Sequence, residues 1–233
     1  MVRRMFDAIA PRYDLLNRLM TLGLDRGWRR RAIGLLRLAP GSSVLDLACG
    51  TADLARELAG AGHRAVGIDS SAGMLVAARA GEAALVQADA GALPFAPGTL
   101  DGVVSGFALR NLADLAGVLA ECGRVLRPGG RIALLEVDTP TSSLLGAAHR
   151  IWMHGVVPLL GAALSERAAY DYLPRSVAYL PPRAELLDLV ARAGFRDVAH
   201  RPLSGGVTQV VTATRVGGRS LPERRATASA RRG

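Results

Sequence analysis

Three acidic residues lie in or directly after apolar segments that we expect to be β-strands. Asp46 lies within VLDLACGTADLA (44–55), Asp69 within GIDSS (67–71) and Asp89 within VQADAGALPF (86–95). In an open parallel sheet the carboxyl ends of the strands meet at one edge, and ligands bind in the crevice outside that edge. Three acids at three consecutive strand ends therefore predict a single binding crevice.

The turn that follows Asp46 is made of small residues and leads into a predicted helix. Small residues let the backbone approach a ligand, and a helix N-terminus attracts an anionic group. A dinucleotide-binding turn needs three glycines, but only Gly50 stands at a key position, and the Asp46 carboxylate would repel a phosphate. We expect instead a ligand with an amino-acid end, whose ammonium meets Asp46 and whose carboxylate meets the helix N-terminus. The structural alternative is an ordinary strand-to-helix turn.

The other two acids are suited to a nucleoside. Asp69 follows Asp46 by 23 residues and is placed to accept hydrogen bonds from both ribose hydroxyls. At the next strand end Asp89 can accept a hydrogen bond from the exocyclic amine of adenine, and the backbone N–H of Ala90 can reach a ring nitrogen. Taken singly, Asp69 is also a good N-cap for the next helix and Asp89 a good turn residue, so both readings stay open.

Strand-like and helical segments alternate along most of the chain. Strands are predicted at 43–47, 64–68, 84–87, 101–105, 131–137, 198–203 and 207–214. Helices are predicted at about 52–59, 72–79, 115–126 and 183–193, with a long Arg-rich helical region at 14–37. This alternation predicts an α/β fold with a doubly wound, mostly parallel sheet. The last two strands are expected to form a hairpin through Ser204-Gly205-Gly206.

Two segments depart from this rhythm and define the expected organisation. We predict one domain over 1–215, with a helical cap at 1–40 and an inserted lid at 140–182, followed by a disordered basic tail at 216–233. Insertions of this kind usually cover a ligand crevice. The apolar tract 144–164 is interrupted by histidines, an arginine and a proline, so we do not expect it to span a membrane.

The charge distribution separates the ends of the chain from its body. Of the net charge of +9 over 233 residues, residues 1–31 carry +5 and residues 216–233 carry +4, whereas 32–215 hold 16 arginines and 16 acids. A neutral body with 4% aromatic residues argues against a nucleic-acid-binding module. The basic tail is suited to binding an anionic partner or to keeping the protein soluble. Two cysteines and no secretory signal predict a cytoplasmic location.

These motifs carry a resemblance. The chain resembles class I S-adenosylmethionine (SAM)-dependent methyltransferases and, more narrowly, the UbiE/MenG-type family that C-methylates the quinone ring in menaquinone and ubiquinone biosynthesis. The similarity runs from about Met5 to Arg215, and its most specific blocks are MFDAIAPRYDLLN (5–17) and FALRNLAD (107–114). Two positions depart from the family pattern, which usually has glycine at Ala52 and often has serine at Gly106.

The resemblance implies a seven-stranded Rossmann-like sheet, SAM as cofactor, S-adenosylhomocysteine as product and a prenylated quinol as substrate, most specifically demethylmenaquinol. No metal is expected, and a homodimer is left open. The residues implied to bind the cofactor are Tyr13, Asp46, Gly50, Thr51, Asp69, Asp89, Ala90 and Gly106. Arg110 and Asn111 are implied to lie beside the acceptor and to be catalytic. Tyr170 and Tyr172 are implied to belong to the lid.

C-methylation of a ring requires an electron-rich carbon, which forms when the neighbouring hydroxyl loses its proton. Because a free phenol has a pKa of about 10, the site must favour the phenolate, and the fixed charge of Arg110 is suited to that. Arg110 is a poor base, so water or a nearby carboxylate must accept the proton. The structural alternative is an arginine that pairs with Asp114 or Glu136. His149 and His154 are further candidates for a base, although histidines in an apolar tract more often serve packing.

A prenylated quinol lies in a bilayer, so the enzyme is expected to dock on a membrane. Candidate surfaces are Arg26 and Arg29–Arg31 around Trp28, and the tract 144–164. The alternative is that these arginines pair with Asp14 and Asp25 and that the tract is core. Competing functions are methylation of another small aromatic or polyketide-type acceptor and, less favoured, a nicotinamide-dependent oxidoreductase.

Overall fold

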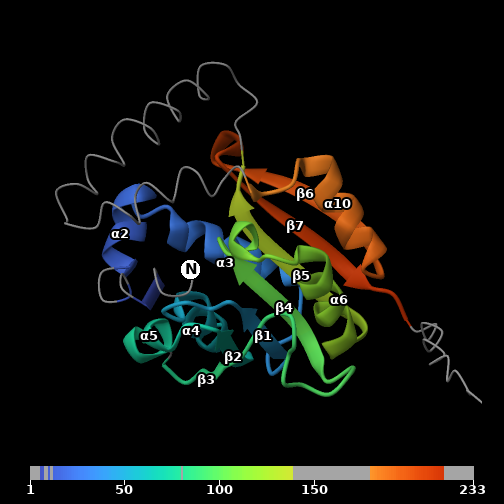
Figure 1. Cartoon of the computed structure of the whole chain (residues 1–233), viewed down its shortest axis with the longest axis horizontal. Helices are drawn as coiled ribbons and strands as arrows, with labels where there is room; N and C mark the ends of the chain where they lie inside the picture. The colour runs from blue at the N-terminus through green and yellow to red at the C-terminus, as the bar shows by residue number, and fades with distance from the viewer. Residues whose placement is uncertain (1–5, 8–9, 11–12, 80, 139–178, 218–233) are drawn as a thin grey trace, which may run out of the picture.

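The computed structural model describes residues 6–7, 10, 13–79, 81–138 and 179–217. Within these ranges the chain forms one seven-stranded sheet in the order β3-β2-β1-β4-β5-β7-β6 (Figure 1). The strands are β1 (Ser43–Leu47), β2 (Arg64–Asp69), β3 (Ala84–Gln87), β4 (Leu100–Gly106), β5 (Leu126–Val137), β6 (Phe195–Leu203) and β7 (Thr208–Arg215). The first five strands pair in parallel, and β7 lies antiparallel between β5 and β6. The predicted doubly wound sheet with a terminal hairpin is confirmed.

Helices cover both faces of the sheet (Figure 1). The described helices include α2 (Tyr13–Met20), α3 (Asp25–Leu36), α4 (Asp53–Gly60), α5 (Ala72–Ala77), α6 (Leu115–Val125) and α10 (Arg183–Arg192), and η2 (Leu109–Asn111) is a single 3₁₀ turn. Buried side chains of α6 and α10 pack on one face of the central strands, and those of α3 and α4 pack on the other. The central strands are therefore buried on both sides, which explains their continuous apolar runs.

The strand bounds follow the sequence closely, with two informative differences. β5 begins at Leu126 rather than at 131, because Leu126 pairs with Leu100 before the register shifts to Gly102 opposite Arg131. β6 begins at Phe195 rather than at 198, and its pairing with β7 is irregular between Arg196 and Ala199. Both differences come from local irregularities of the backbone, which an apolar pattern does not reveal.

The N-terminal region packs more deeply than a detached cap would. Trp28 is 8% exposed, and its indole N–H donates a 2.8 Å hydrogen bond to Ser204 Oγ in the β6–β7 turn. Arg29 on the same helix is 11% exposed and forms ion pairs with Asp25 on α3 and with Asp53 and Glu57 on α4. The expectation that Trp28 and Arg29 face a membrane is therefore wrong, because both belong to the interface between α3 and the body of the protein.

Most of the predicted lid and tail lies outside the described residues, including His149, His154, Tyr170 and Tyr172. The domain boundaries given above for these segments stay predictions. No helix among the described residues combines the length and the apolar character that crossing a bilayer requires.

Candidate active site

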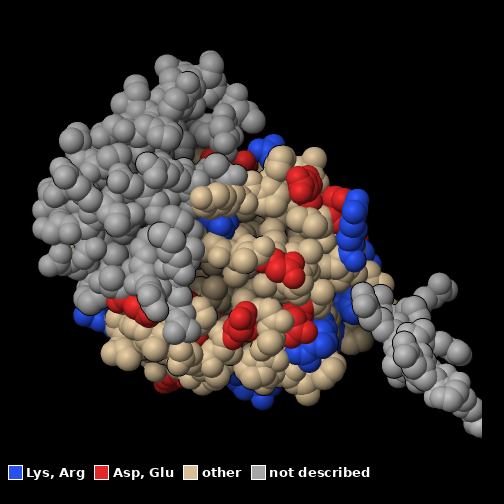
Figure 2. Space-filling model, in the orientation of Figure 1, with Lys and Arg blue, Asp and Glu red and all other residues tan. Residues whose placement is uncertain are grey.

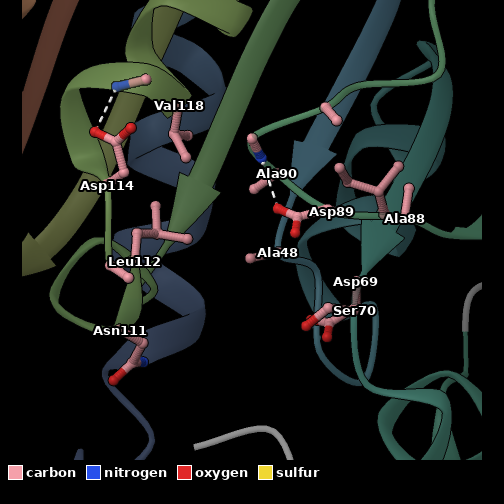
Figure 3. Close-up of a pocket in the computed structure, with 15 residues that line it drawn as sticks. Ala48, Asp69, Ser70, Ala88, Asp89, Ala90, Asn111, Leu112, Asp114 and Val118 are labelled. Atoms are coloured by element: carbon pink, nitrogen blue, oxygen red, sulfur yellow. Dashed lines mark hydrogen bonds between the residues drawn. The ribbon is translucent and has the colours of Figure 1, made fainter.

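A cleft lies at the carboxyl edge of the sheet and consists of two adjoining cavities of about 510 and 180 Å³. The cavities share five lining residues from the ends of β1 and β2 and from the segment after β4, namely Ala48, Asp69, Ser70, Asn111 and Leu112. In Figure 3, Asn111, Leu112 and Val118 lie on one side of the larger cavity, and Asp69, Asp89 and Ala90 lie on the other. The size is typical of a small-molecule or cofactor site.

Asp69 occupies the junction between the two cavities. Its Oδ2 accepts a 2.8 Å hydrogen bond from Gly50 N and its Oδ1 accepts one of 2.8 Å from Ser71 N. Burial raises the pKa of this carboxyl, while the backbone donors lower it. The two donors orient the carboxylate, and each oxygen keeps a lone pair for a ligand hydroxyl. The helix cap itself is Ser71, whose Oγ accepts from Met74 N, so the capping alternative for Asp69 is not needed.

The small-residue turn after β1 is held in a left-handed conformation. Ala48, Gly50 and Ala52 have φ values of 55°, 54° and 64°. Glycine adopts this conformation without cost, whereas alanine pays about 1–2 kcal/mol for it. Ala52, at the position where the family usually has glycine, thus keeps a glycine-like backbone and is fully buried. The departure noted in the sequence leaves the tight turn intact.

Asp46 precedes this turn and Thr51 belongs to it, but neither residue lines either cavity. Asp46 is 1% exposed, and its Oδ2 accepts a 2.8 Å hydrogen bond from Ala55 N in the first turn of α4. Burial raises the pKa of Asp46 to about 8. Thr51 donates its hydroxyl hydrogen to Asp14 Oδ1 of α2 at 2.5 Å. Both residues fix the elements around the turn, and their direct contact with a ligand stays a prediction.

Asp89 and Ala90 line the larger cavity beyond β3, as the sequence predicted. Asp89 Oδ1 accepts a 2.8 Å hydrogen bond from Gly91 N, which folds the loop after β3 into a turn (Figure 3). The turn alternative and the ligand-binding alternative are therefore compatible, because a carboxylate has acceptor sites beyond this one bond. Leu112 and Val118 provide an apolar wall across the cavity from them (Figure 3).

The N-terminal segment forms a wall of the smaller cavity through Phe6 and Tyr13. Their rings meet edge to face at 6.1 Å, and burial raises the pKa of the Tyr13 hydroxyl. Asp7 Oδ1 accepts hydrogen bonds from Ser71 Oγ at 2.5 Å and from Gly73 N at 3.0 Å. The segment is thereby attached to the start of α5, close to Asp69.

Arg110 lies in η2, directly after β4, and its side chain is 9% exposed. It forms an ion pair with Glu136, whose side chain is fully buried near the end of β5. Of the two partners considered from the sequence, Glu136 is the one observed, whereas Asp114 caps α6 by accepting from Gly117 N. Asn111 and Gly106 line the cleft, but Arg110 does not. Its role toward an acceptor stays a prediction.

Several lining residues were not predicted as site residues. They come from the N-terminal segment, from the start of α5 and from the segment after β4, and include Phe6, Ser71, Met74, Phe107 and Leu112. Each of them is close in sequence to a residue of one of the motifs, and this closeness is the feature of the sequence that could have identified them. The charged residues among the described lining are Asp69, Asp89 and Asp114, and no arginine or histidine is among them.

This composition determines which ligands the cleft accepts. Acidic side chains border a hollow on the described surface (Figure 2), and such a cleft favours a cationic ligand with hydroxyl and amine donors and disfavours a pyrophosphate. No group of three or more histidine, cysteine or acidic side chains suited to a metal ion occurs within the described residues. SAM, with its sulfonium and ammonium charges and its hydroxyl and amine donors, fits these acidic acceptors, whereas the pyrophosphate of a nicotinamide dinucleotide does not.

Comparison with known proteins agrees with this chemistry. The sequence model of the ubiE/COQ5 methyltransferase family matches residues 1–215. The chain belongs to this family. It is 44% identical over 228 residues to a ubiquinone/menaquinone biosynthesis C-methyltransferase UbiE from Syntrophotalea carbinolica, covering 94% of each chain. It is 43% identical over 215 residues to a demethylmenaquinone methyltransferase from Mycolicibacterium vanbaalenii, covering 92% of this chain and 94% of that protein.

Solved structures support the fold of this methyltransferase. A SAM-dependent methyltransferase from Thermotoga maritima superposes with a TM-score of 0.65 at 19% identity, covering 92% of this chain and 99% of that one. One from Aquifex aeolicus gives a TM-score of 0.58 at 17% identity, covering 81% and 89%. The Rossmann-like class I fold is therefore confirmed, and SAM is the cofactor of this family member.

Proposed function

We propose that this methyltransferase transfers the methyl group of SAM to a ring carbon of a prenylated quinol, with demethylmenaquinol as substrate and menaquinol as product. The observation that most strongly supports this function is the acidic cleft at the ends of β1 and β2, which has no basic side chain among its described lining residues. The functions of these two relatives, both in quinone methylation, support the acceptor.

The lining residues that the sequence predicted as cofactor-binding have separate roles in this proposal. Asp69 accepts hydrogen bonds from the ribose hydroxyls, and Asp89 and the Ala90 N–H bind the adenine edge. Tyr13, Gly50 and Gly106 surround the amino-acid end, next to the turn that Asp46 and Thr51 hold in place. The bound cofactor supplies an electrophilic methyl group on its sulfonium.

The chain's contribution to the acceptor chemistry is electrostatic. Arg110 and Asn111 lie after β4, on the side of the cleft where the acceptor enters in this proposal. The guanidinium of Arg110 favours the ionised form of the quinol hydroxyl, which makes the neighbouring ring carbon nucleophilic. The hydroxyl proton passes to water or to a carboxylate, since an arginine is always protonated.

An assay with radiolabelled SAM and a panel of acceptors tests the function. The panel contains demethylmenaquinol, a ubiquinol precursor that lacks the ring methyl, the same rings without their prenyl chains, and a small polyketide-type phenol. We expect label in a ring carbon of the prenylated quinols. Label only in the unprenylated or polyketide acceptors would replace the proposed substrate with the alternative one. Separately, SAM but not NADH should raise the melting temperature.

We also infer that the enzyme acts in the cytoplasm while docked on the anionic inner surface of the cell membrane. The supporting feature is a leucine surface at α2 and the turn after it, where Leu15, Leu19, Leu22 and Leu24 are 50%, 36%, 69% and 51% exposed. Exposed Arg18, Arg26 and Arg30 come from the same stretch of chain. Apolar side chains beside arginines complement an anionic bilayer surface, whose acyl region they can enter.

A further inference from the structure

We propose that Glu136 is a positioning residue for methyl transfer, acting by holding Arg110. The inference rests on the proposed function, in which Arg110 favours the ionised quinol hydroxyl. Glu136 binds the arginine at two points, the guanidinium and the backbone, and thereby fixes the turn that carries Asn111 and Leu112 into the cleft.

The contacts of Glu136 link the end of β5 to η2. Its Oε1 pairs with Arg110 Nη1 and accepts a 2.9 Å hydrogen bond from Val137 N, and its Oε2 lies 3.4 Å from Arg110 N. The turn itself closes through Asn111 N to Ala108 O at 2.9 Å and Leu112 N to Leu109 O at 3.2 Å. A movement of Glu136 would therefore displace both the guanidinium and the lining residues that follow it.

The surroundings of the pair point to the cleft. The charges of Arg110, Glu136 and Asp69 all act on the hydroxyl of Tyr13, which lines the smaller cavity. Asn111 and Leu112, directly after Arg110, line both cavities. The pair thus stands next to the site, within the region where an acceptor meets the donor in the proposed function.

Stability alone does not account for such a pair. A fully buried ion pair is often no more stabilising than apolar side chains of the same volume, because both charges lose their hydration. Glu121 on α6 provides a contrast, since 21% of its side chain is exposed. It pairs with Arg124 one turn later on the helix and accepts a hydrogen bond from Leu93 N in the segment after β3. Glu121 thus makes the same kinds of contact, an ion pair and a backbone hydrogen bond, without losing all its hydration. The buried Glu136 carboxylate, in contrast, orients the charged guanidinium of Arg110 next to the cleft.

Replacing Glu136 with glutamine keeps its size and one acceptor oxygen but removes the charge. We expect kcat to fall by about 10²-fold, the effect of a small misplacement of a group at the reacting centre, with the Kd of SAM within about twofold of wild type. Loss of a negative charge beside Arg110 also makes ionisation of the acceptor easier. The acidic limb of the kcat/KM profile should therefore move to lower pH, which a loss of fold stability would not produce.

The test measures kcat, KM for the quinol, the pH profile and SAM binding for Glu136→Gln, Arg110→Ala and the double variant, with Glu121→Gln as the matched control. The double variant should be no slower than Arg110→Ala, because Glu136 acts through Arg110. If kcat falls in Arg110→Ala but stays at the wild-type value in Glu136→Gln, the positioning role of Glu136 is overturned and the role of Arg110 is kept. A wild-type Arg110→Ala overturns the proposed role of Arg110 itself. Effects that multiply in the double variant show that Glu136 acts independently and also overturn the inference.

A second variant covers the case in which Glu136→Gln does not fold. Glu136→Asp keeps the charge but shortens the reach to Arg110 by one methylene. It should lower kcat at an unchanged SAM Kd, with no shift of the acidic limb because the charge is retained. Wild-type turnover in Glu136→Asp would mean that the position of the carboxylate does not matter for the reaction, against the inference.

Discussion

Asp46 and Asp69 are both aspartates at strand ends, yet their neighbours give them different roles. Asp69 lines both cavities and accepts two backbone hydrogen bonds that leave it open to the cleft. Asp46 is buried behind the turn and accepts from Ala55 N. A sequence places both at the same edge of the sheet, but only the orientation of each side chain in the folded chain decides which one lines the cleft. For this reason the strand-end motifs of the sequence correctly placed Asp69, Asp89 and Gly50 at the cleft, but could not show that Asp46 is buried behind the turn.

Asp69→Ala tests the cofactor site. Loss of an acceptor for two hydroxyls should weaken SAM binding by about 1.5–3 kcal/mol, the range for hydrogen bonds to a charged group. The fold should persist because Asp69 stands at an open cleft. Calorimetry with SAM checks this, and Asp197→Ala, on an exposed part of β6, is the control. Equal affinities in the two folded variants would remove Asp69 from the binding site.

The buried carboxyl of Asp46 predicts a pH dependence of stability. Its pKa of about 8 in the folded state is above the value of about 3.9 expected for an unfolded chain. The native state therefore binds the proton more tightly, so this contribution to stability is complete below about pH 4 and is lost as the pH rises through about 8.

Asp46→Asn removes that dependence while keeping an oxygen for Ala55 N. Relative to wild type, the variant should gain unfolding free energy as the pH rises from 5 to 8, by more than about 1 kcal/mol, since each pH unit in this window is worth about 1.4 kcal/mol. Urea denaturation of the protein without SAM at several pH values measures the gain. Asp197→Asn should show a flat difference, and a flat difference in Asp46→Asn as well would contradict the prediction.

At the scale of elements, α3 is the clearest departure from the sequence-based picture. The arginines around Trp28 were predicted to form a membrane-docking surface, but Ala32, Ile33 and Leu36 pack on the sheet with Trp28. The strand pattern gave β1 and β3 their observed bounds because local apolar runs determine them. The partners of α3 are distant in sequence, as the contact of Trp28 with Ser204 shows, and a local pattern carries no information about them.

The ion-pair network of Arg29 joins α3 to α4 and so supports the turn that precedes α4. Arg29→Ala would leave Asp25, Asp53 and Glu57 close together without their shared cation. We expect a loss of about 3–5 kcal/mol of unfolding free energy, the usual result of breaking a buried charge network. Arg30→Ala, at an adjacent position that is 63% exposed, should stay within about 0.5 kcal/mol of wild type. Denaturant titration compares them, and similar losses in both variants would refute the structural role.

At the scale of the whole molecule, charge and apolar surface are distributed unevenly. The body from 32 to 215 is neutral while both ends are basic, and the described exposed leucines belong to α2 and the turn after it. The sequence predicted the basic N-terminal region as a docking surface. It could not tell buried Trp28 and paired Arg29 from exposed Arg26 and Arg30, because exposure depends on how α3 packs.

Docking through the leucine surface predicts binding to vesicles that depends on both charge and apolar side chains. Three arginines at about 1 kcal/mol each give about 3 kcal/mol, so attachment should be reversible and should weaken as salt rises. We expect co-sedimentation with anionic but not with neutral vesicles, and a chain ending at 215 should keep much of it. Replacing Leu22 and Leu24 with serine should lower binding at every salt concentration, because these side chains no longer enter the acyl region.

Val76→Ser is the control, since Val76 is 87% exposed but lies on α5. Binding that is abolished by removing 216–233 alone, or lowered equally by Val76→Ser, would place the membrane contact elsewhere on the molecule.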